Sequence, residues 1–456
     1  MKNVKKFVSL CLIMIMTFAV FALAGCGKEP HTHAYGAEYY TVSSDKTKAY
    51  KTKTCACGHS VNIKIENAVI VNPTNAQAEL DKNINGKTIV FDEGVYGDLI
   101  MRPTRETVEG IYAYDPENPT VKGAEVNLAD VDTTKTTKGY HYDRTLENIV
   151  FAGTKNAQFK GLFTFESGNV GGAEGTNDTA YFTDKSRLGL AENRKDVIRN
   201  LELTTTNSAY GWTDICYSAH VDMDKLSFDR MNFNGKYGRI YFYEGKVDSV
   251  QKNISITNCK FETDEAYKSG HEYYDFDAPA VAIYTRSTGF YENITFKNNT
   301  IVGHFQGLVV LNGKNVYVEE NAISGTEHNA LAFHGASTLT NGAKNTYTTG
   351  NIVIKNNSIK NIGVGVATGE RAFRFANLTD AKVSITGNSF ENCAEDRTGK
   401  KPTSQGKQLL ATETVSETVE GASSFVFENN TYKGKSMTLK KDGNKYIVYT
   451  ELPVTE

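Results

Sequence analysis

The sequence predicts an all-β solenoid of stacked coils, because one short apolar pattern recurs along its second half. The pattern is an apolar residue, any residue, an apolar residue, any four residues and a third apolar residue. Its copies are Leu226/Phe228/Phe233, Ile254/Ile256/Phe261, Ile294/Phe296/Ile301, Val316/Val318/Ile323, Ile352/Ile354/Ile359, Val383/Ile385/Phe390 and Phe425/Phe427/Tyr432. The middle residue advances by 28, 40, 22, 36, 31 and 42 residues. Such an array, with variable insertions, is typical of coils that bury their apolar side chains only against neighbouring coils.

Each copy predicts two strands joined by a tight turn. Apolar residues two apart point to the same side of a strand, and the odd step to the next apolar residue requires a turn between them. Asparagine recurs in this turn, because it tolerates a left-handed backbone and its amide forms local hydrogen bonds. We expect a ladder of stacked asparagines, with the members Asn232, Asn258, Asn298, Asn299, Asn321, Asn356, Asn357, Asn388, Asn429 and Asn430.

A third strand follows each turn and completes the coil. Its copies are Ile240–Phe242, Val281–Ile283, Leu308–Val310, Leu331–Phe333 and Phe373–Phe375. Rows of three strands per coil predict three parallel sheets around one apolar core. The coils between residues 100 and 225 are assigned by continuity alone.

This pattern resembles the right-handed parallel β-helix superfamily that contains the pectate lyases and polygalacturonases, over roughly Thr74 to Tyr449. The segment Asn85–Tyr96 looks like the first coil of many such proteins, and Asn75–Ile84 looks like their amphipathic capping helix. A cap is needed physically, because the first coil otherwise exposes its core and its strand edges. The resemblance implies a right-handed parallel β-helix solenoid with an N-terminal capping helix over residues 67–456.

Residues 1–26 are predicted to be a targeting segment. Lysines precede an apolar run from Phe7 to Ala24, and Leu23-Ala24-Gly25-Cys26 resembles the bacterial lipoprotein processing site. The resemblance implies lipidation of Cys26 and a membrane-anchored, extracytoplasmic protein at the bacterial cell surface. A plain secretory signal or a transmembrane anchor is the alternative, although the run is short for a membrane span.

Residues 27–66 differ in composition and are predicted to form a small separate module. The chain there contains His31, His33, Cys55, Cys57 and His59, and it resembles Cys/His modules repeated in surface proteins of Gram-positive gut bacteria. Two interpretations stay open. The cluster binds Zn²⁺ tetrahedrally, or the module is an inert β-hairpin spacer with two free thiols or a bridged pair.

Charge and cysteine content exclude some classes of protein. The 456 residues carry 50 basic and 53 acidic groups, a net charge of −3, and no basic block follows the targeting segment. This balance argues against a nucleic-acid partner. Among the later cysteines, Cys216, Cys259 and Cys393, at least one is unpaired within the predicted helix, and we expect small buried apolar residues rather than a disulfide framework.

The outward face of the third strands is the candidate site. Residues between the inward positions form two rows, one with Tyr243, Tyr284 and His334 and one with Tyr241 and Arg374. Glu244 and Arg286 lie just past the strands. Insertions before and after these strands should wall the face into a cleft.

Aromatic and cationic side chains on this face suit an acidic sugar chain. We predict substrate contacts for Tyr241, Tyr243, Tyr284 and Glu244, and catalytic roles for Arg286, His334 and Arg374. Asp275 and Asp277, in the loop before one third strand, are candidate ligands of Ca²⁺. For each residue a purely structural role is the alternative: strand packing for the tyrosines, ion pairs for the arginines and solvated loop acids for the aspartates.

The predicted function is binding or degradation of a polysaccharide at the cell surface. Hydrolases of the polygalacturonase type need grouped carboxylates, but the chain has no Asp-Asp pair, and Phe333-His334-Gly335 only faintly resembles their Gly-His-Gly motif. A lyase acting on an acidic glycan needs a cation or Arg to neutralise a uronate and a base to remove a proton. The alternatives are a non-catalytic adhesin or glycan-binding protein, and a structural surface spacer.

Anchoring through Cys26 can be tested by one substitution. Cys26→Ser should leave the protein unprocessed or released from the membrane, because stable attachment needs acyl chains on that residue. Membrane fractionation of cells that produce the parent or the variant measures this. Normal processing and anchoring of the serine variant would contradict the lipoprotein interpretation.

Overall fold

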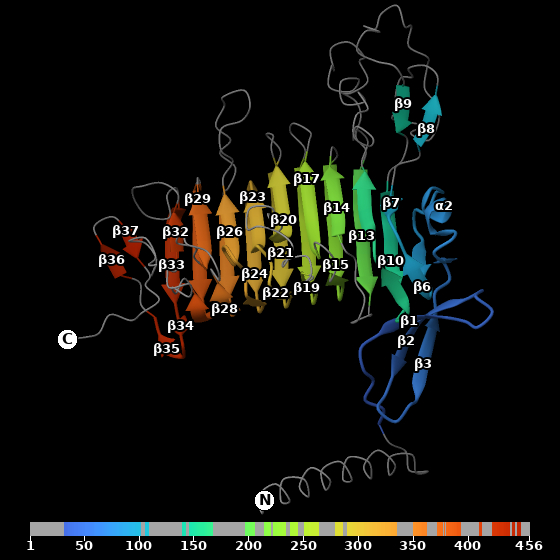
Figure 1. Ribbon diagram of the computed structural model, residues 1–456, viewed down its shortest axis with the longest axis horizontal. Helices are drawn as coiled ribbons and strands as arrows, with labels where there is room; N and C mark the ends of the chain where they lie inside the picture. Colours follow the sequence, from blue (N-terminus) through green and yellow to red (C-terminus); the bar gives the residue numbers. More distant parts are fainter. Residues whose placement is uncertain are drawn as a thin grey trace, which may run out of the picture.

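The computed structural model is built almost entirely of strands, stacked along one long axis (Figure 1). It describes residues 32–101, 105–108, 139–142, 146–166, 197–205, 214–219, 222–233, 238–244, 250–263, 279–285, 290–334, 350–362, 372–376, 378, 380–393, 410–412, 422–437, 440–442 and 445–447. Across these residues, no helix has the length and apolar character needed to cross a membrane.

Three long parallel sheets run along the solenoid. The first-strand sheet contains β4 (Ala68–Val71), β5 (Thr88–Phe91), β10 (Leu146–Gly153), β13 (Val197–Thr205), β15 (Asp222–Asp229), β18 (Val250–Thr257), β21 (Phe290–Lys297), β24 (Gly313–Glu319), β27 (Gly350–Lys355), β30 (Ala381–Thr386) and β33 (Ala422–Glu428). The second-strand sheet contains β16 (Asn232–Phe233), β19 (Lys260–Glu262), β22 (Thr300–Val302), β25 (Ala322–Ser324), β28 (Ser358–Ile362), β31 (Ser389–Cys393) and β34 (Thr431–Tyr432), and β35 (Lys435–Ser436) joins it antiparallel.

The third-strand sheet carries the candidate site. It contains β7 (Leu99–Met101), β12 (Leu162–Glu166), β14 (Asp214–Ala219), β17 (Arg239–Glu244), β20 (Pro279–Thr285), β23 (Gln306–Leu311), β26 (Leu331–His334), β29 (Phe373–Ala376) and β32 (Leu410–Thr412). The strand order follows the chain, and from β15 to β32 each coil adds one strand to each of the three long sheets. This architecture is the parallel β-helix that the repeat predicts, in the right-handed form that the family resemblance implies.

Shorter pairings complete the described strands. They are β6 (Gly94–Tyr96) with β11 (Ala157–Phe159), β8 (Arg105–Val108) with β9 (Gly139–Tyr142) and β36 (Lys440–Asp442) with β37 (Lys445–Ile447). The first of these pairs is parallel and the other two are antiparallel.

The predicted register of the repeat is confirmed residue by residue. Neighbouring coils pair Phe228 with Ile256, Ile256 with Phe296, and so on to Phe427. All members of this row are buried in one core cluster that runs through the solenoid. Stacked apolar rows of this kind supply the hydrophobic stabilisation that no single coil could obtain alone.

The structure divides the predicted asparagine ladder into two positions with different roles. Outer residues such as Asn298 and Asn356 adopt a left-handed backbone, with φ of 55° and 56°. The residue after each of these is buried, and its side chain continues an internal ladder, whose members are Asn299, Asn321, Asn357, Asn388 and Asn430. Asn232 belongs to neither position, because it begins β16 and pairs with Lys260.

Each ladder amide satisfies groups of the neighbouring coils. Asn357 Nδ2 donates to the Val318 carbonyl (2.9 Å) and to Asn388 Oδ1 (2.9 Å). Its Oδ1 accepts from the backbone N–H of Asn321 (2.9 Å) and from Asn321 Nδ2 (2.8 Å). Buried polar groups are costly unless they are paired in this way.

A second, exposed row of asparagines was not predicted. Asn148, Asn200, Asn253, Asn293 and Asn315 adopt a left-handed backbone within the first strands, with φ of 52° to 60°. Neighbours in the row are linked through their side chains, for example Asn293 Nδ2 to Asn253 Oδ1 at 3.1 Å. The sequence does contain a signal, since each of them directly precedes a buried apolar residue of its strand.

The N-terminal end of the solenoid contains a helix shorter than predicted. Helix α2 spans Ala76–Leu80, within the predicted segment, and Ala76 and Leu80 are buried in the main core cluster. It contacts β4 and β7, the first strands of two sheets. Its role as a cap stays a prediction, as do the predicted domain boundaries, although the stack begins at Ala68.

The N-terminal module is a three-stranded antiparallel sheet of β1 (Tyr39–Val42), β2 (Ala49–Thr54) and β3 (Ser60–Lys64). It lies at the N-terminal end of the solenoid (Figure 1). Tyr40 and Ala49 from the module are buried against Val90 and Ala152 from the outward face of the first-strand sheet. Apolar residues therefore replace the polar ones that this face carries in later coils.

Polar contacts add to this docking. Tyr40 forms a parallel bridge with Thr154, and Lys46 Nζ lies 2.6 Å from an Asp92 carboxylate oxygen. Arg230 Nη1 donates to the Glu38 carbonyl at 2.9 Å. The module is therefore packed on the solenoid rather than joined to it by a linker alone.

The described cysteines of the solenoid behave as small buried residues. Cys259 and Cys393 are both free and buried. Burial raises the pKa of the Cys259 thiol to about 12, which keeps it protonated. The side chain of Cys216 lies outside the described residues.

The internal ladder should be essential for stability. Asn357→Ala leaves the Val318 carbonyl, the Asn321 backbone N–H and both ladder neighbours without their partner, and we expect a loss of about 2–4 kcal/mol in the free energy of unfolding. The matched control is Asn356→Gly, because glycine tolerates the left-handed backbone at this exposed position. Denaturant unfolding of the three proteins measures the difference. Equal stability of both variants would contradict the proposed role of the buried amide.

Candidate functional site

The third-strand sheet pairs those predicted site residues that lie in its strands in the predicted register. Tyr243 of β17 pairs with Tyr284 of β20, and Glu244 pairs with Thr285. Farther along the sheet, Ala332 of β26 pairs with Arg374 of β29. The strands β17 and β29 are four positions apart, about 19 Å at the usual strand spacing.

Only part of the predicted site can be described at the level of side chains. The side chains of Tyr243, Glu244 and Tyr284 lie outside the described part of the chain, although their backbones are in strands. Arg286 and the proposed calcium ligands Asp275 and Asp277 lie wholly outside it, as does the proposed lipidation site Cys26. The roles of these residues stay predictions.

Arg374 and His334 form the best-defined part of the site. His334 ends β26 and pairs with Ala376, two residues beyond Arg374 on the adjacent strand. The two side chains are therefore diagonal neighbours on the outward face, a position within reach of long side chains. Both are partly exposed, whereas the inward neighbours Phe373 and Phe375 are buried in the core.

The electrostatic surroundings keep His334 neutral at neutral pH. Burial disfavours the imidazolium, and the nearby charge of Arg374 disfavours it further, so the pKa of His334 falls to about 4. A neutral imidazole retains a lone pair that can accept a hydrogen bond or a proton. Arg374 is a cation suited to bidentate recognition of a carboxylate. The pair therefore combines a cation with a neutral acceptor.

One of the two outward rows of the predicted face is covered in its middle. Ala282, Val309 and Ala332 occupy the outward row between Tyr241 and Arg374, yet their exposed fractions are 0%, 3% and 0%. They do not belong to the core cluster inside the solenoid. Between Tyr241 and Arg374 this row is therefore closed, whereas Leu311, in the row that contains His334, is partly exposed.

Tyr241 has a partner within the chain. The guanidinium carbon of Arg239 lies 4.8 Å from the centre of the Tyr241 ring, a cation–π contact. A sugar ring stacking on that side of the tyrosine would have to compete with Arg239. The predicted sugar contact of Tyr241 stays a prediction.

Two histidines that the sequence analysis did not select lie in the turns before the third strands. His304 is fully buried, and its Nδ1 lies 3.0 Å from Thr263 Oγ1. The His328 ring packs against Phe305 with ring centres 4.2 Å apart. Both could have been found from the sequence, because each lies three or four residues before an apolar third strand. Their contacts, however, assign them to the packing of the turns.

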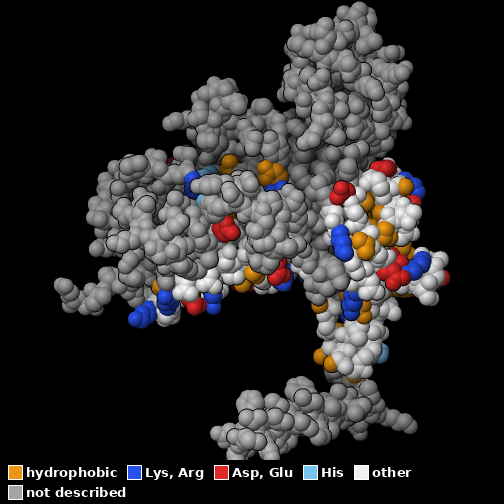
Figure 2. Space-filling view, in the orientation of Figure 1, with side chains coloured by type: hydrophobic (Ala, Val, Ile, Leu, Met, Phe, Trp, Pro, Cys, Tyr) orange, Lys and Arg blue, Asp and Glu red, His pale blue; other side chains and the backbone are white. Residues whose placement is uncertain are grey.

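The outward face of the first strands is polar in the later coils and carries both signs of charge. Lys297 lies 3.5 Å from Glu319 and 3.4 Å from Glu320, and Lys314 lies 3.3 Å from Glu292. Figure 2 also shows acidic and basic side chains interspersed along the lower edge of the solenoid, where Figure 1 places second strands such as β19 and β28. Exposed pairs of this kind contribute little to stability, and they form no cationic surface comparable to the Arg374 position.

Comparisons with known proteins find only distant similarity. No family model matches the sequence, and no curated protein matches it. A hyperthermoactive exopolygalacturonase from Thermotoga maritima is similar over 72% of this chain and 87% of its own, with 13% identity and a TM-score of 0.26. The tailspike protein gp49 from Acinetobacter baumannii bacteriophage Fri1, a capsular polysaccharide depolymerase, is similar over 84% and 75%, with 12% identity and a TM-score of 0.23. Values this low carry no inference about chemistry.

The low pKa of His334 predicts a specific sensitivity to acid. Between the ordinary histidine pKa of 6.5 and the folded value of about 4, the unfolded chain binds a proton at this residue and the folded chain does not. Stability linked to His334 is therefore complete above the unfolded pKa and is lost as the pH falls towards the folded pKa.

The variant His334→Gln should lose less stability than the parent between pH 7 and pH 4.5, because glutamine does not titrate. Thermal melts of both proteins at the two pH values measure this difference. An identical fall in melting temperature in parent and variant would show that the pKa of His334 is not depressed in the folded state.

Proposed function

We propose that the third-strand face around Arg374 and His334 binds an acidic polysaccharide. The observation that carries this proposal is the adjacency of a partly exposed arginine and a histidine kept neutral by burial and by that arginine. The arginine suits the carboxylate of a uronate, and the neutral imidazole suits a hydroxyl or a C–H proton of the same sugar. The repeated strand spacing suits a polymer of repeating units.

The same pair supports cleavage by β-elimination. With the uronate carboxylate held by Arg374, His334 would take the proton from the carbon beside the carboxylate. The electron pair of that C–H bond forms the new carbon–carbon double bond, and the glycosidic oxygen leaves with its bonding electrons and a proton from solvent. Binding of an anion at Arg374 would also offset the charge that lowers the pKa of His334, so substrate would strengthen the base.

Non-catalytic glycan binding is the second candidate. Burial is the larger cause of the low pKa of His334, so the residue stays a weak base even when Arg374 is neutralised. The covered strip at Ala282, Val309 and Ala332 also shortens the surface that a sugar chain could contact. A protein that binds a glycan at one end of this face would need neither a strong base nor an extended groove.

The location of the protein is a separate proposal. The lipoprotein-like sequence around Cys26 supports an extracytoplasmic, membrane-anchored protein at the cell surface. A polysaccharide would be accessible to such a protein without transport.

Arg374→Ala tests the proposed site. We expect at least ten-fold weaker binding of acidic polysaccharides, because the alanine cannot pair with a carboxylate, and partial recovery in Arg374→Lys, which keeps the charge but not the bidentate geometry. The matched control is Lys355→Ala, which removes an exposed cation from the first-strand face. Binding to a panel of acidic and neutral polysaccharides is measured by affinity electrophoresis.

A second assay separates the two candidates. Absorbance of unsaturated products is followed with every acidic polysaccharide that binds. Products that vanish in Arg374→Ala and His334→Gln support the lyase, and binding without products supports the non-catalytic protein. Binding equal in parent, Arg374→Ala and Lys355→Ala would contradict the proposed site, provided that all three proteins melt at similar temperatures.

A further inference from the structure

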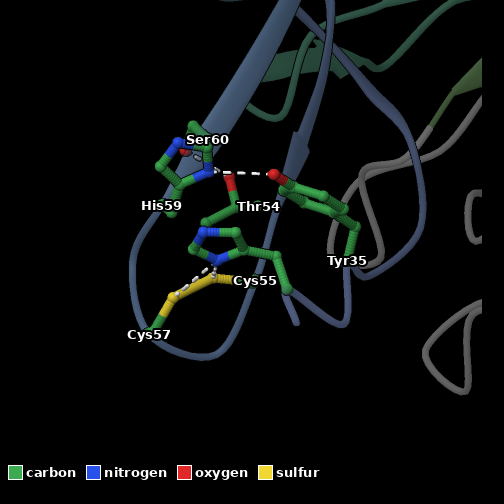
Figure 3. The surroundings of a disulfide bond; sticks show 7 residues. Tyr35, Thr54, Cys55, Cys57, His59 and Ser60 are labelled. Carbon is green, nitrogen blue, oxygen red and sulfur yellow. Dashed lines mark hydrogen bonds between the residues drawn. A yellow bond between two sulfur atoms is a disulfide. The ribbon is translucent and has the colours of Figure 1, made fainter. Parts of the chain in front are cut away.

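The tip of the N-terminal module brings three soft metal-ligand groups together, away from the proposed glycan site. Cys55 and Cys57 are bonded as a disulfide (Figure 3). His33 Nδ1 lies 3.4 Å from each of their sulfur atoms. The donor atoms of these residues all lie within 4.8 Å of one another. His33 and Cys57 are partly exposed, so an ion could reach the group from solvent.

Three backbone segments hold this arrangement in place. The strands β2 and β3 pair up to Thr54 and Ser60, and the turn between them is closed by hydrogen bonds from Cys55 N to His59 O and from Gly58 N to Cys55 O, each 2.9 Å. Gly58 has φ of +84°, a conformation in which a side chain would be strained. The segment that carries His33 is tied to β2 by the hydrogen bond from Gly36 N to Thr54 O (3.0 Å).

The distances from histidine to sulfur fit a shared metal ion. In a tetrahedral zinc site with Zn–S of about 2.3 Å and Zn–N of about 2.0 Å, the nitrogen and sulfur ligands lie roughly 3.5 Å apart. Both distances from His33 Nδ1 are close to this value. The ring nitrogen therefore already faces the two sulfurs at the separation that coordination requires.

His59 is placed as a positioning residue and not as a ligand. Its ring stacks on that of His33, with centres 4.2 Å apart and planes inclined by 21°, and its Nδ1 lies 2.9 Å from the Tyr35 hydroxyl. The lone pair of an imidazole lies in the ring plane, so two nearly parallel stacked rings cannot both point at one ion. The stack instead orients His33 toward the sulfurs, and Tyr35 orients His59.

We propose that reduction of the Cys55–Cys57 disulfide creates a site for a thiophilic divalent cation such as Zn²⁺, with Cys55, Cys57 and His33 as ligands. An external dithiol supplies the two electrons and two protons that convert the disulfide to two thiols, and is itself oxidised to a disulfide. Binding of the cation then displaces the two thiol protons. Three protein ligands leave one coordination position for water. Oxidation and metal binding exclude one another, because both use the same two sulfurs.

Cobalt spectroscopy on the full chain tests this proposal. The chain carries Cys26→Ser, and Co²⁺ is added before and after reduction with an excess of a dithiol that is then removed under anaerobic conditions. We expect one Co²⁺ per chain only after reduction, with the absorption bands of tetrahedral thiolate coordination, and displacement of Co²⁺ by Zn²⁺. Circular dichroism confirms that the reduced chain stays folded.

Variants assign the ligands. Cys55→Ser and Cys57→Ser should abolish the thiolate bands, and His33→Ala should weaken Co²⁺ binding at least ten-fold. The matched controls Cys259→Ser and Cys393→Ser remove buried thiols elsewhere and should change nothing. His59→Ala should weaken binding less than His33→Ala, and an equal loss would overturn the three-ligand assignment. Absence of tetrahedral bands in the reduced folded chain, or bands that survive Cys55→Ser, would overturn the site and leave the disulfide with a structural role only.

Discussion

The stacking of each coil on the next in a single register is the constraint on which the rest of the structure depends. Backbone hydrogen bonds fix the spacing of the strands, but they cannot satisfy the polar groups at a buried corner. The internal amides of Asn299, Asn321, Asn357 and Asn388 do this, because each joins a backbone carbonyl of the preceding coil to the ladder residue of the following one. The corner can therefore be buried without unpaired groups, and coils of very different length stack at the same height.

This register determines which side chains become neighbours on the outer surface. Insertions of many residues separate β26 from β29 along the chain, yet Arg374 and His334 become diagonal neighbours because their strands are adjacent in the sheet. The scaffold therefore places the cation beside the imidazole, and burial then lowers the pKa of that imidazole. The same scaffold leaves Ala282, Val309 and Ala332 covered, which restricts ligand contacts along that outward row to its ends.

One end of the N-terminal module packs on the solenoid, and the tip at its other end lies away from that contact. Ala49 at the start of β2 is buried against the first coils, whereas the cluster of Cys55, Cys57 and His33 follows the end of that strand. A strand of this length separates the two by roughly 17 Å. The contact with the solenoid and the proposed metal site therefore lie at opposite ends of one hairpin. Reduction of the disulfide need not disturb the packed contact.

The sequence alone determined the coils, the inward rows and the three strands per coil. Side chains alternate along a strand, and the odd step to the next apolar residue requires a turn, so only one arrangement buries residues such as Ile256, Phe296 and Ile354. It also selected Arg374 and His334 and placed them in adjacent rows, but it did not show that burial and the charge of Arg374 lower the pKa of His334. Only the tertiary structure decided which asparagine of each pair bends the backbone and which is buried, because one residue type serves both roles. It alone showed the covered strip at Val309 and Ala332, the docking of Tyr40 and the approach of His33 to both sulfurs. These features arise from contacts between segments far apart in the chain, and local pattern and propensity carry no information about such contacts.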